Sequence, residues 1–122
     1  MKKAIMPQEI EVWYLIPALR RELTKTLMRD HNLSQRRIAE MMGLSEPAIS
    51  QYLTSKRGSD IKFTNEEKQE IKRAANNIVN KNENLVKTLY GLCVKFRGSK
   101  TMCEIHKQHD PTLPHNCDFC VE

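Results

Sequence analysis

The feature that most constrains this chain is the stretch SQRRIAEMMGLSEPAISQYL at residues 34–53, which predicts two short helices separated by a tight turn. The apolar residues of each half recur at the spacing of one helix face: Ile38, Ala39 and Met42 in the first half, and Ile49, Tyr52 and Leu53 in the second. Between the halves, Gly43 suits the positive φ angle that commonly ends a helix. The remaining side chains are mostly polar, so they are expected to face outward.

Cap residues mark where the two helices begin. Ser34 and Ser45 each stand immediately before one helix, where a hydroxyl oxygen accepts a hydrogen bond from a backbone N–H that has no partner inside the helix. Pro47 falls in the first turn of the second helix, where its missing N–H costs little. Two helices joined in this way form either an αα-hairpin used only for packing or a unit that presents its second helix to a partner.

Four residues at fixed offsets bear on this choice: Gln35, Ala39, Gly43 and Ile49. Together with the segment YLTSKRG that begins at Tyr52, they form a pattern that resembles the Xre/Cro-type helix-turn-helix family, which includes the lambda repressor. The resemblance covers roughly residues 16–58. It implies an all-α fold in which the helix at about residues 45–54 reads the major groove of double-stranded DNA.

The resemblance also implies roles for individual residues. The base-contacting positions of the family fall on Gln35, Glu46, Pro47 and Gln51. Glu46 and Pro47 depart from the amide and hydroxyl side chains common there, so the base sequence that is read stays open. Thr54 falls where the family usually holds a backbone phosphate, and Ser45 and Ser50 are expected beside the base readers. Phosphate contacts are also expected from four basic residues: Arg36, Arg37, Lys56 and Arg57.

A further helix is predicted before this unit. Pro17 fits its first turn, and it has a buried stripe of leucines at every fourth residue: Leu19, Leu23 and Leu27. Some of the basic residues on its other faces are expected to contact phosphate: Arg20, Arg21, Lys25 and Arg29. The dense apolar cluster within residues 1–15 is either a dimerisation arm or an extra core helix.

After the unit, the capping-box sequence TNEE at residues 64–67 starts another helix. Its apolar side is predicted to consist of Ile71, Ala74, Ala75, Ile78 and Val79. Residues 80–84 interrupt the helix, and the apolar spacing resumes in a linker helix that leads to Cys93. The chain therefore divides into a DNA-binding helix-turn-helix domain with its N-terminal helical arm at residues 1–79, and a linker helix with a small, cysteine-rich, metal-binding extension at residues 80–122.

The charge distribution suits a nucleic-acid partner. Residues 1–58 contain ten basic and six acidic side chains, residues 59–97 eight and five, and residues 98–122 two and four. The positive excess lies with the helices, and the slightly acidic tail is expected to point away from DNA. No signal peptide or membrane span is visible, so we expect a cytoplasmic protein with no membrane partner. Cysteines in that compartment are thiols or metal ligands rather than disulfides.

The four cysteines Cys93, Cys103, Cys117 and Cys120 have the spacing C-x9-C-x13-C-x2-C. Four thiolates hold either a tetrahedral zinc ion or an iron–sulfur cluster. His106 stands three residues after Cys103, so a zinc site that leaves out Cys93 is also open. Residues 98–122 contain few apolar side chains, and we expect them to fold only around a metal centre.

The complete pattern looks like archaeal helix-turn-helix regulators with a terminal cysteine cluster, and this resemblance favours an iron–sulfur cluster of the 4Fe–4S type over zinc. The prediction is a homodimeric transcription regulator whose cluster senses redox state, oxygen or iron. The alternatives are the same regulator with a purely structural zinc, and an antitoxin-like interaction protein whose DNA binding is secondary. Neither an enzyme nor a small-molecule substrate is expected, because the C-x2-C pair lacks the βαβ surroundings of thiol-redox catalysis.

Overall fold

The computed structural model describes residues 6–54, 61–97 and 99–109, and within these ranges every regular element is a helix. The protein is therefore all-α, as predicted. Among the described helices, none combines the length and the apolar character that a membrane crossing needs. Four of the predicted site residues lie outside the described residues: Lys56, Arg57, Cys117 and Cys120.

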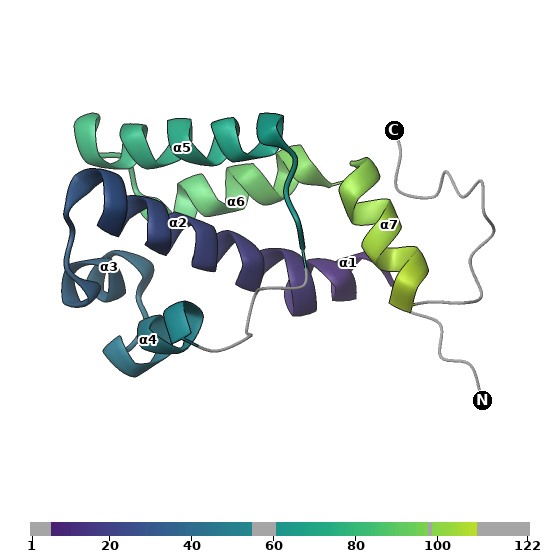
Figure 1. Ribbon diagram of the computed structural model, residues 1–122, viewed down its shortest axis with the longest axis horizontal. Coiled ribbons are helices and arrows are strands. Elements are labelled where there is room, and N and C mark those ends of the chain that lie inside the picture. Colours follow the sequence, from purple (N-terminus) through teal and green to yellow (C-terminus); the bar gives the residue numbers. More distant parts are fainter. Residues whose placement is uncertain (1–5, 55–60, 98, 110–122) are drawn as a thin grey trace.

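The helices are arranged around one long central helix, α2 (Figure 1). The short α1 (Pro7–Ile10) and a π-helical turn, η1 (Glu11–Leu15), run directly into α2 (Ile16–His31). The other described helices are α3 (Gln35–Met42), α4 (Glu46–Thr54), α5 (Asn65–Asn80), α6 (Leu85–Phe96) and α7 (Lys100–His109). Helix α2 contacts α3 and α4 as well as α5 and α6, while α7 contacts α1.

The predicted leucine stripe forms the centre of the core. Leu19, Leu23 and Leu27 are fully buried, and one hydrophobic cluster connects Ile10 in α1 with Ile105 in α7. Pro17 lies in the first turn of α2, as predicted. The apolar cluster before α2 is partly buried and partly exposed, and its role as a dimerisation arm stays a prediction. Its residues Ile10 and Leu15 are buried in the core, whereas Met6, Val12 and Trp13 are exposed.

Helix α5 begins with the predicted capping box. The Glu67 backbone N–H donates to Thr64 Oγ1 at 3.1 Å, and the Thr64 N–H donates to Glu67 Oε1 at 2.9 Å. Four of the five residues predicted for its apolar side are buried: Ile71, Ala74, Ala75 and Ile78. The prediction was wrong for Val79, which is 37% exposed. Val79 lies about 90° from the centre of that face at 3.6 residues per turn, and the helix ends at Asn80.

Helix α6 starts after the predicted interruption and packs into the core. Asn84 Oδ1 accepts a hydrogen bond from the Lys87 backbone N–H at 2.9 Å and so caps the first turn. The apolar side of α6 is buried: Leu85, Leu89, Leu92, Cys93 and Phe96. Because this side contacts α2, α3 and α5, the helix predicted as a linker is part of the hydrophobic core.

Helix α7 has no counterpart among the helices predicted from the sequence. Its buried side chains, Met102, Ile105 and His106, follow the i, i+3, i+4 spacing of one helix face. Ser99 Oγ accepts from the Met102 backbone N–H at 3.2 Å, and the Thr101 hydroxyl donates to Glu67 Oε1 of α5 at 3.0 Å. Three side chains on a helix of ten residues are too short a pattern to be recognised from the sequence.

Substitution of Gly43 and of Gly91 by alanine is expected to change the free energy of unfolding in opposite directions, because the two glycines have different backbone conformations. Gly43 has φ 69° and no atom within 4 Å of an added Cβ, so Gly43→Ala is strained by its backbone conformation alone. We expect its free energy of unfolding to fall by about 1–2 kcal/mol. Gly91 lies inside α6 with equal space, and we expect Gly91→Ala to raise that free energy by about 0.5–1 kcal/mol. Urea denaturation of both variants measures the two changes. If both variants were stabilised, or both destabilised, the backbone conformations given for these two glycines would be contradicted.

Candidate nucleic-acid interface

Backbone capping fixes the turn between α3 and α4. Ser34 Oγ accepts from the Arg37 backbone N–H at 3.1 Å and begins α3, as predicted. At the other end Gly43 adopts the left-handed conformation, and the Leu44 N–H donates to the Ala39 carbonyl at 3.0 Å. Ser45 Oγ then accepts from the Ala48 N–H at 3.3 Å and begins α4. The chain therefore passes from α3 to α4 within three residues, with a cap hydrogen bond on each side of the turn.

The inner face of α4 is held by α2 and α3. Ile49 is 0% exposed and Tyr52 is 1% exposed, and α4 contacts both neighbouring helices. Two arginines of α2 add hydrogen bonds, because Arg20 Nη1 donates to the Tyr52 hydroxyl at 3.3 Å and Arg21 Nη1 donates to the Tyr52 carbonyl at 3.0 Å. That carbonyl belongs to the last turn of α4, where a positive charge is favourable.

These contacts give Arg20 and Arg21 a role that sequence analysis missed. Some of the four basic residues of α2 were expected to contact phosphate; in the structure Arg20 and Arg21 both donate to Tyr52 and help to orient α4. Sequence spacing carried no signal for this pairing, because Arg20 and Tyr52 are 32 residues apart in the chain.

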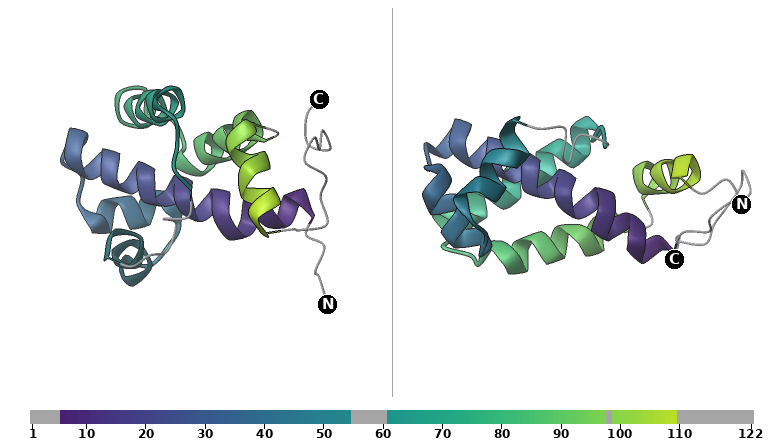
Figure 2. Two further views of the ribbon diagram at one scale, coloured as in Figure 1. Left: turned by 45° about the vertical axis from the view of Figure 1, so that its right-hand side comes forward. Right: turned by 90° about the horizontal axis from the view of Figure 1, so that it is seen from below.

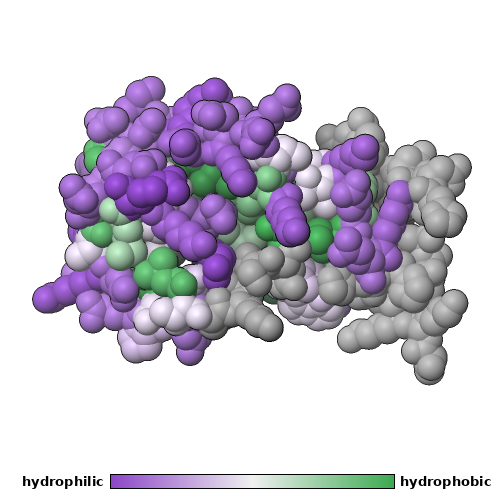
Figure 3. All heavy atoms as spheres, viewed as in Figure 1, coloured by the Kyte–Doolittle hydropathy of each residue, from purple (hydrophilic) through white to green (hydrophobic). Residues whose placement is uncertain are grey.

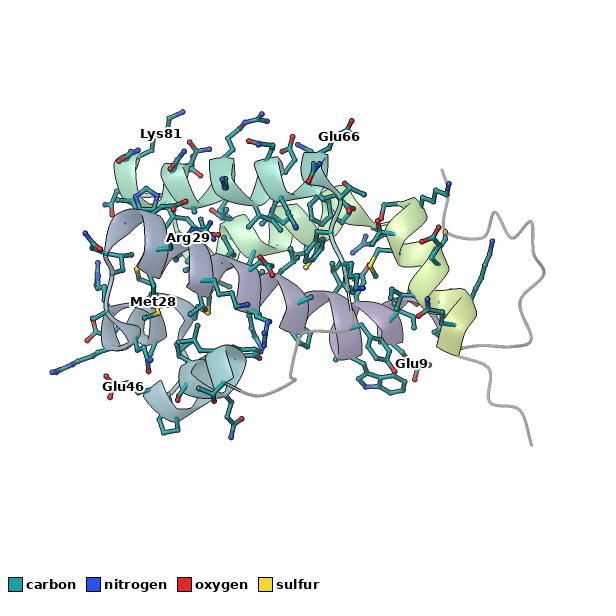
Figure 4. All side chains as sticks on the ribbon, in the orientation of Figure 1. Glu9, Met28, Arg29, Glu46, Glu66 and Lys81 are labelled. Carbon is teal, nitrogen blue, oxygen red and sulfur yellow. The ribbon has the colours of Figure 1, made fainter. Side chains whose placement is uncertain are left out.

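The outer face of α4 gathers all the residues of this helix that were predicted to contact DNA. Pro47, Ser50, Gln51 and Thr54 follow the i, i+3, i+4, i+7 spacing of one stripe, with Glu46 beside it at the start of the helix. Of these, Glu46, Pro47, Gln51 and Thr54 are exposed and Ser50 is partly exposed. Figure 4 shows Glu46 pointing away from the body of the molecule. We call these five residues the α4 outer face.

Helix α3 contributes a small charged group. Arg36 Nε lies 3.7 Å from Glu40 Oε1, and Arg37 Nη1 lies 3.5 Å from Glu40 Oε2. All three side chains are more than half exposed, so each ion pair contributes at most about 1 kcal/mol and a phosphate can replace Glu40 as a partner. Gln35, the remaining residue predicted on α3, is partly exposed in its first turn.

Two further basic residues flank the junction of α2 with α4. Lys25 and Arg29, with Met28 and Leu53, line a shallow hollow between these helices. Figure 3 shows this side of the molecule as mainly hydrophilic, with a small hydrophobic area beside α4. Arg29 also pairs with Asp30 at 3.0 Å, and its hydrogen bond lowers the pKa of the Asp30 carboxyl.

The two described cysteines lie on adjacent helices and are free thiols. Cys93 is buried on α6 and Cys103 is half-buried on α7. Burial, and secondly the charge of Glu11, raise the pKa of the Cys93 thiol to about 11. Glu11 in turn binds Arg97 at the end of α6, with 2.6 Å between Oε1 and Nε, so that η1 and α6 are joined beside Cys93.

The described residues do not by themselves form a complete metal site. Within residues 6–54, 61–97 and 99–109, no group of three or more His, Cys, Asp and Glu side chains is close enough to hold an ion. His106, the alternative ligand, is 3% exposed on the face of α7 that also buries Met102 and Ile105. The four-cysteine site stays a prediction, because it requires Cys117 and Cys120 in addition to the two described thiols.

Comparisons with protein-family models, curated proteins and solved structures found no match for this chain. The resemblance to the Xre/Cro-type family therefore stays a prediction, and a functional proposal rests on the α4 outer face and the cysteine pattern.

The two described cysteines are expected to differ in reactivity. In metal-free protein, iodoacetamide should modify Cys103 before Cys93, because the thiolate is the reactive form and Cys93 is both buried and weakly acidic. The Cys93 rate should keep rising by about tenfold per pH unit from about pH 8 to 10. Peptide mass mapping over time measures both rates, with urea-unfolded protein as the control. Equal rates at the two sites in the native protein would contradict the structure.

Proposed function

We propose that this protein is a sequence-specific DNA-binding transcription regulator that places α4 in the major groove. The observation that carries the proposal is the α4 outer face, which presents an exposed stripe from Pro47 to Thr54 while Ile49 and Tyr52 anchor the opposite side. In this interpretation α3 and α4 form a helix-turn-helix unit. A helix is about 10–12 Å wide with its side chains, and the major groove is about 12 Å wide.

The side chains of the α4 outer face suit direct readout. Gln51 matches the donor and acceptor pair of adenine, and Glu46 accepts from the amino group of cytosine. Pro47 offers an apolar contact to the methyl group of thymine. Thr54 would contact a phosphate by turning its hydroxyl from the Ser50 carbonyl, to which it donates at 2.8 Å, to a phosphate oxygen. The stripe from Pro47 to Thr54 is about 10 Å long at 1.5 Å per residue, and therefore spans about three base pairs.

Basic residues around α4 supply the contacts that do not depend on sequence. Arg36 and Arg37 at the start of α3 outnumber Glu40, and the whole chain carries a formal net charge of +5. Lys56 and Arg57 follow α4 in the chain, separated from its end by one residue. Such cations neutralise phosphates and make the affinity for DNA depend on salt concentration.

The readout is tested by paired substitutions. Gln51→Ala is expected to weaken binding to a duplex selected from a random library by about 1–3 kcal/mol, with little change for unrelated DNA. Lys56→Ala should weaken both duplexes alike, because it removes a phosphate contact. Gln69→Ala on α5 is the matched control, since Gln69 is also an exposed helical glutamine, on a helix that lies on the other side of α2 from α4 (Figure 1).

Fluorescence anisotropy at fixed salt concentration measures these affinities. Equal losses of specific and unspecific binding in the Gln51 and Lys56 variants would contradict the assigned roles. A wild-type protein that selects no sequence from the library, and binds DNA no better than its Gln51→Ala variant, would contradict the function itself.

We further propose that the four cysteines hold an iron–sulfur cluster, with structural zinc as the alternative. When bound, such a cluster supplies a centre sensitive to oxygen and redox state. The support is the pair of free thiols, Cys93 and Cys103, on the consecutive helices α6 and α7. Helix α6, which carries Cys93, also contacts α3, so a change at the thiols is connected to the proposed DNA-binding unit by one rigid helix.

Substitution of a ligand tests this second proposal. Cys117→Ser in anaerobically purified protein should lose most of its iron and sulfide, or its zinc, because one of four ligands is removed. His115→Ala is the control, since His115 is not among the predicted ligands. Elemental analysis and visible absorption distinguish the two metals. A Cys117→Ser protein with full metal content would exclude Cys117 as a ligand.

A rival function is an antitoxin-like interaction protein whose DNA binding is secondary. The observation in its favour is the exposure of Val12 and Trp13 on η1, at 59% and 45%. Large exposed apolar side chains commonly mark protein–protein contacts. Recovery of a toxin bound to this segment, together with weak and unselective DNA binding, would favour the rival.

A further inference from the structure

Helix α6 exposes a line of apolar side chains on a side that the core does not cover. Val86, Tyr90 and Val94 are 53%, 66% and 44% exposed, and their spacing of four residues places them on one face. The right-hand view of Figure 2 shows α6 along the lower edge of the molecule, with no other described helix on its outer side. Single exposed apolar residues are common, but an aligned set on one helix marks a contact surface.

The pattern around Tyr90 is symmetric. A valine lies four residues away in each direction, at Val86 and Val94. Seven residues away stand opposite charges, with Glu83 just before the helix and Arg97 just after it. We call these five residues the α6 stripe; its helical part, from Val86 to Val94, is about 12 Å long at 1.5 Å per residue.

We infer that the α6 stripe is a homodimer interface in which two copies of α6 pack antiparallel about a twofold axis through Tyr90. This arrangement places Tyr90 against the partner's Tyr90 and Val86 against the partner's Val94. It also places Glu83 against the partner's Arg97. A twofold interface must be complementary to itself, and a pattern that reads the same from both ends, with its charges reversed, meets that condition.

The charged ends of the stripe are available for this pairing. Glu83 is exposed, and the Arg97 side chain is 48% exposed. Glu11 already accepts from Arg97 Nε and Nη2, at 2.6 and 3.4 Å. The guanidinium has five N–H donors, so Nη1 is left to bind a second carboxylate. The contact with Glu11 also holds Arg97 in place before a partner arrives, which reduces the entropy lost on pairing.

Sedimentation equilibrium on the full chain, without DNA, tests the inference. The wild type should form a dimer, and Tyr90→Glu should raise its dissociation constant by about tenfold or more, because two carboxylates then face each other at the axis. Val79→Glu is the control, since it places the same charge on an exposed apolar site of α5. Circular dichroism should show unchanged helix content in both variants, as Tyr90 makes little core contact at 66% exposure.

Cross-linking tests the register. Tyr90→Cys should form an intermolecular disulfide between equivalent positions under mild oxidation, since the axis passes through that site. Val86→Cys alone should not link to itself, because the two copies of position 86 lie about 12 Å apart along the helix axes. A mixture of the Val86→Cys and Val94→Cys proteins should link to each other. Peptide mapping separates these links from any made by the four native cysteines.

Three results would overturn the inference: a monomeric wild type, a Tyr90→Glu protein that dimerises as tightly as the wild type, or a self-link at position 86 without one at position 90. None of these experiments uses DNA. A failure of the inferred dimer is therefore distinguishable from a failure of the proposed DNA binding.

Discussion

The attachment of α4 to α2 is the contact on which the candidate interface depends. Helix α4 has only nine residues, and isolated helices of this length are unstable in water. Its conformation and direction therefore come from the burial of Ile49 and Tyr52 and from the two arginines that bind Tyr52. Because the inner face is fixed so firmly, the outer face is presented as a rigid surface rather than as a flexible segment.

A second set of contacts ties α6 to its neighbours. Lys95 binds Glu70 of α5 at 2.5 Å, and Arg97 binds Glu11 of η1 at 2.6 Å, while the apolar side of α6 lies in the core. Cys93 is therefore held within packed helices and not in a separate appendage. The same helix carries the α6 stripe on its other side, so the thiol, the core and the inferred dimer contact belong to one rigid element.

This arrangement connects the three proposals physically. A dimer that joins two copies through α6 fixes the distance between their α4 helices, and two half-sites on DNA must be met at a fixed spacing. Since α6 contacts α3 directly, a change in the surroundings of Cys93 would, under these proposals, act on the same element that sets this spacing. Packed helices shift as units rather than deform, which is the physical basis for the proposed connection.

Much of the local structure was predictable because its causes are local. Ser34, Gly43 and the capping box at Thr64 act within four residues of themselves, and each does in the structure what its residue type predicts. The stripe of leucines on α2 and the polar outer face of α4 likewise follow from helical period alone. The all-α architecture, the capped ends of α3, the start of α5 and the grouping of the predicted α4 residues therefore came from the amino-acid sequence by itself.

Only the tertiary structure decided which distant residues meet. Arg20 and Arg21 bind Tyr52, and Arg97 binds Glu11 across 86 residues of chain. Val79 is exposed although the other residues of its predicted apolar side are buried. The ten-residue α7 is held by contacts with α1 and α5, and its own apolar spacing does not predict these contacts. The physical reason is that periodicity and caps depend on the interactions of a single helix with itself and with water. The features named here depend instead on which surfaces of the other helices are available for packing.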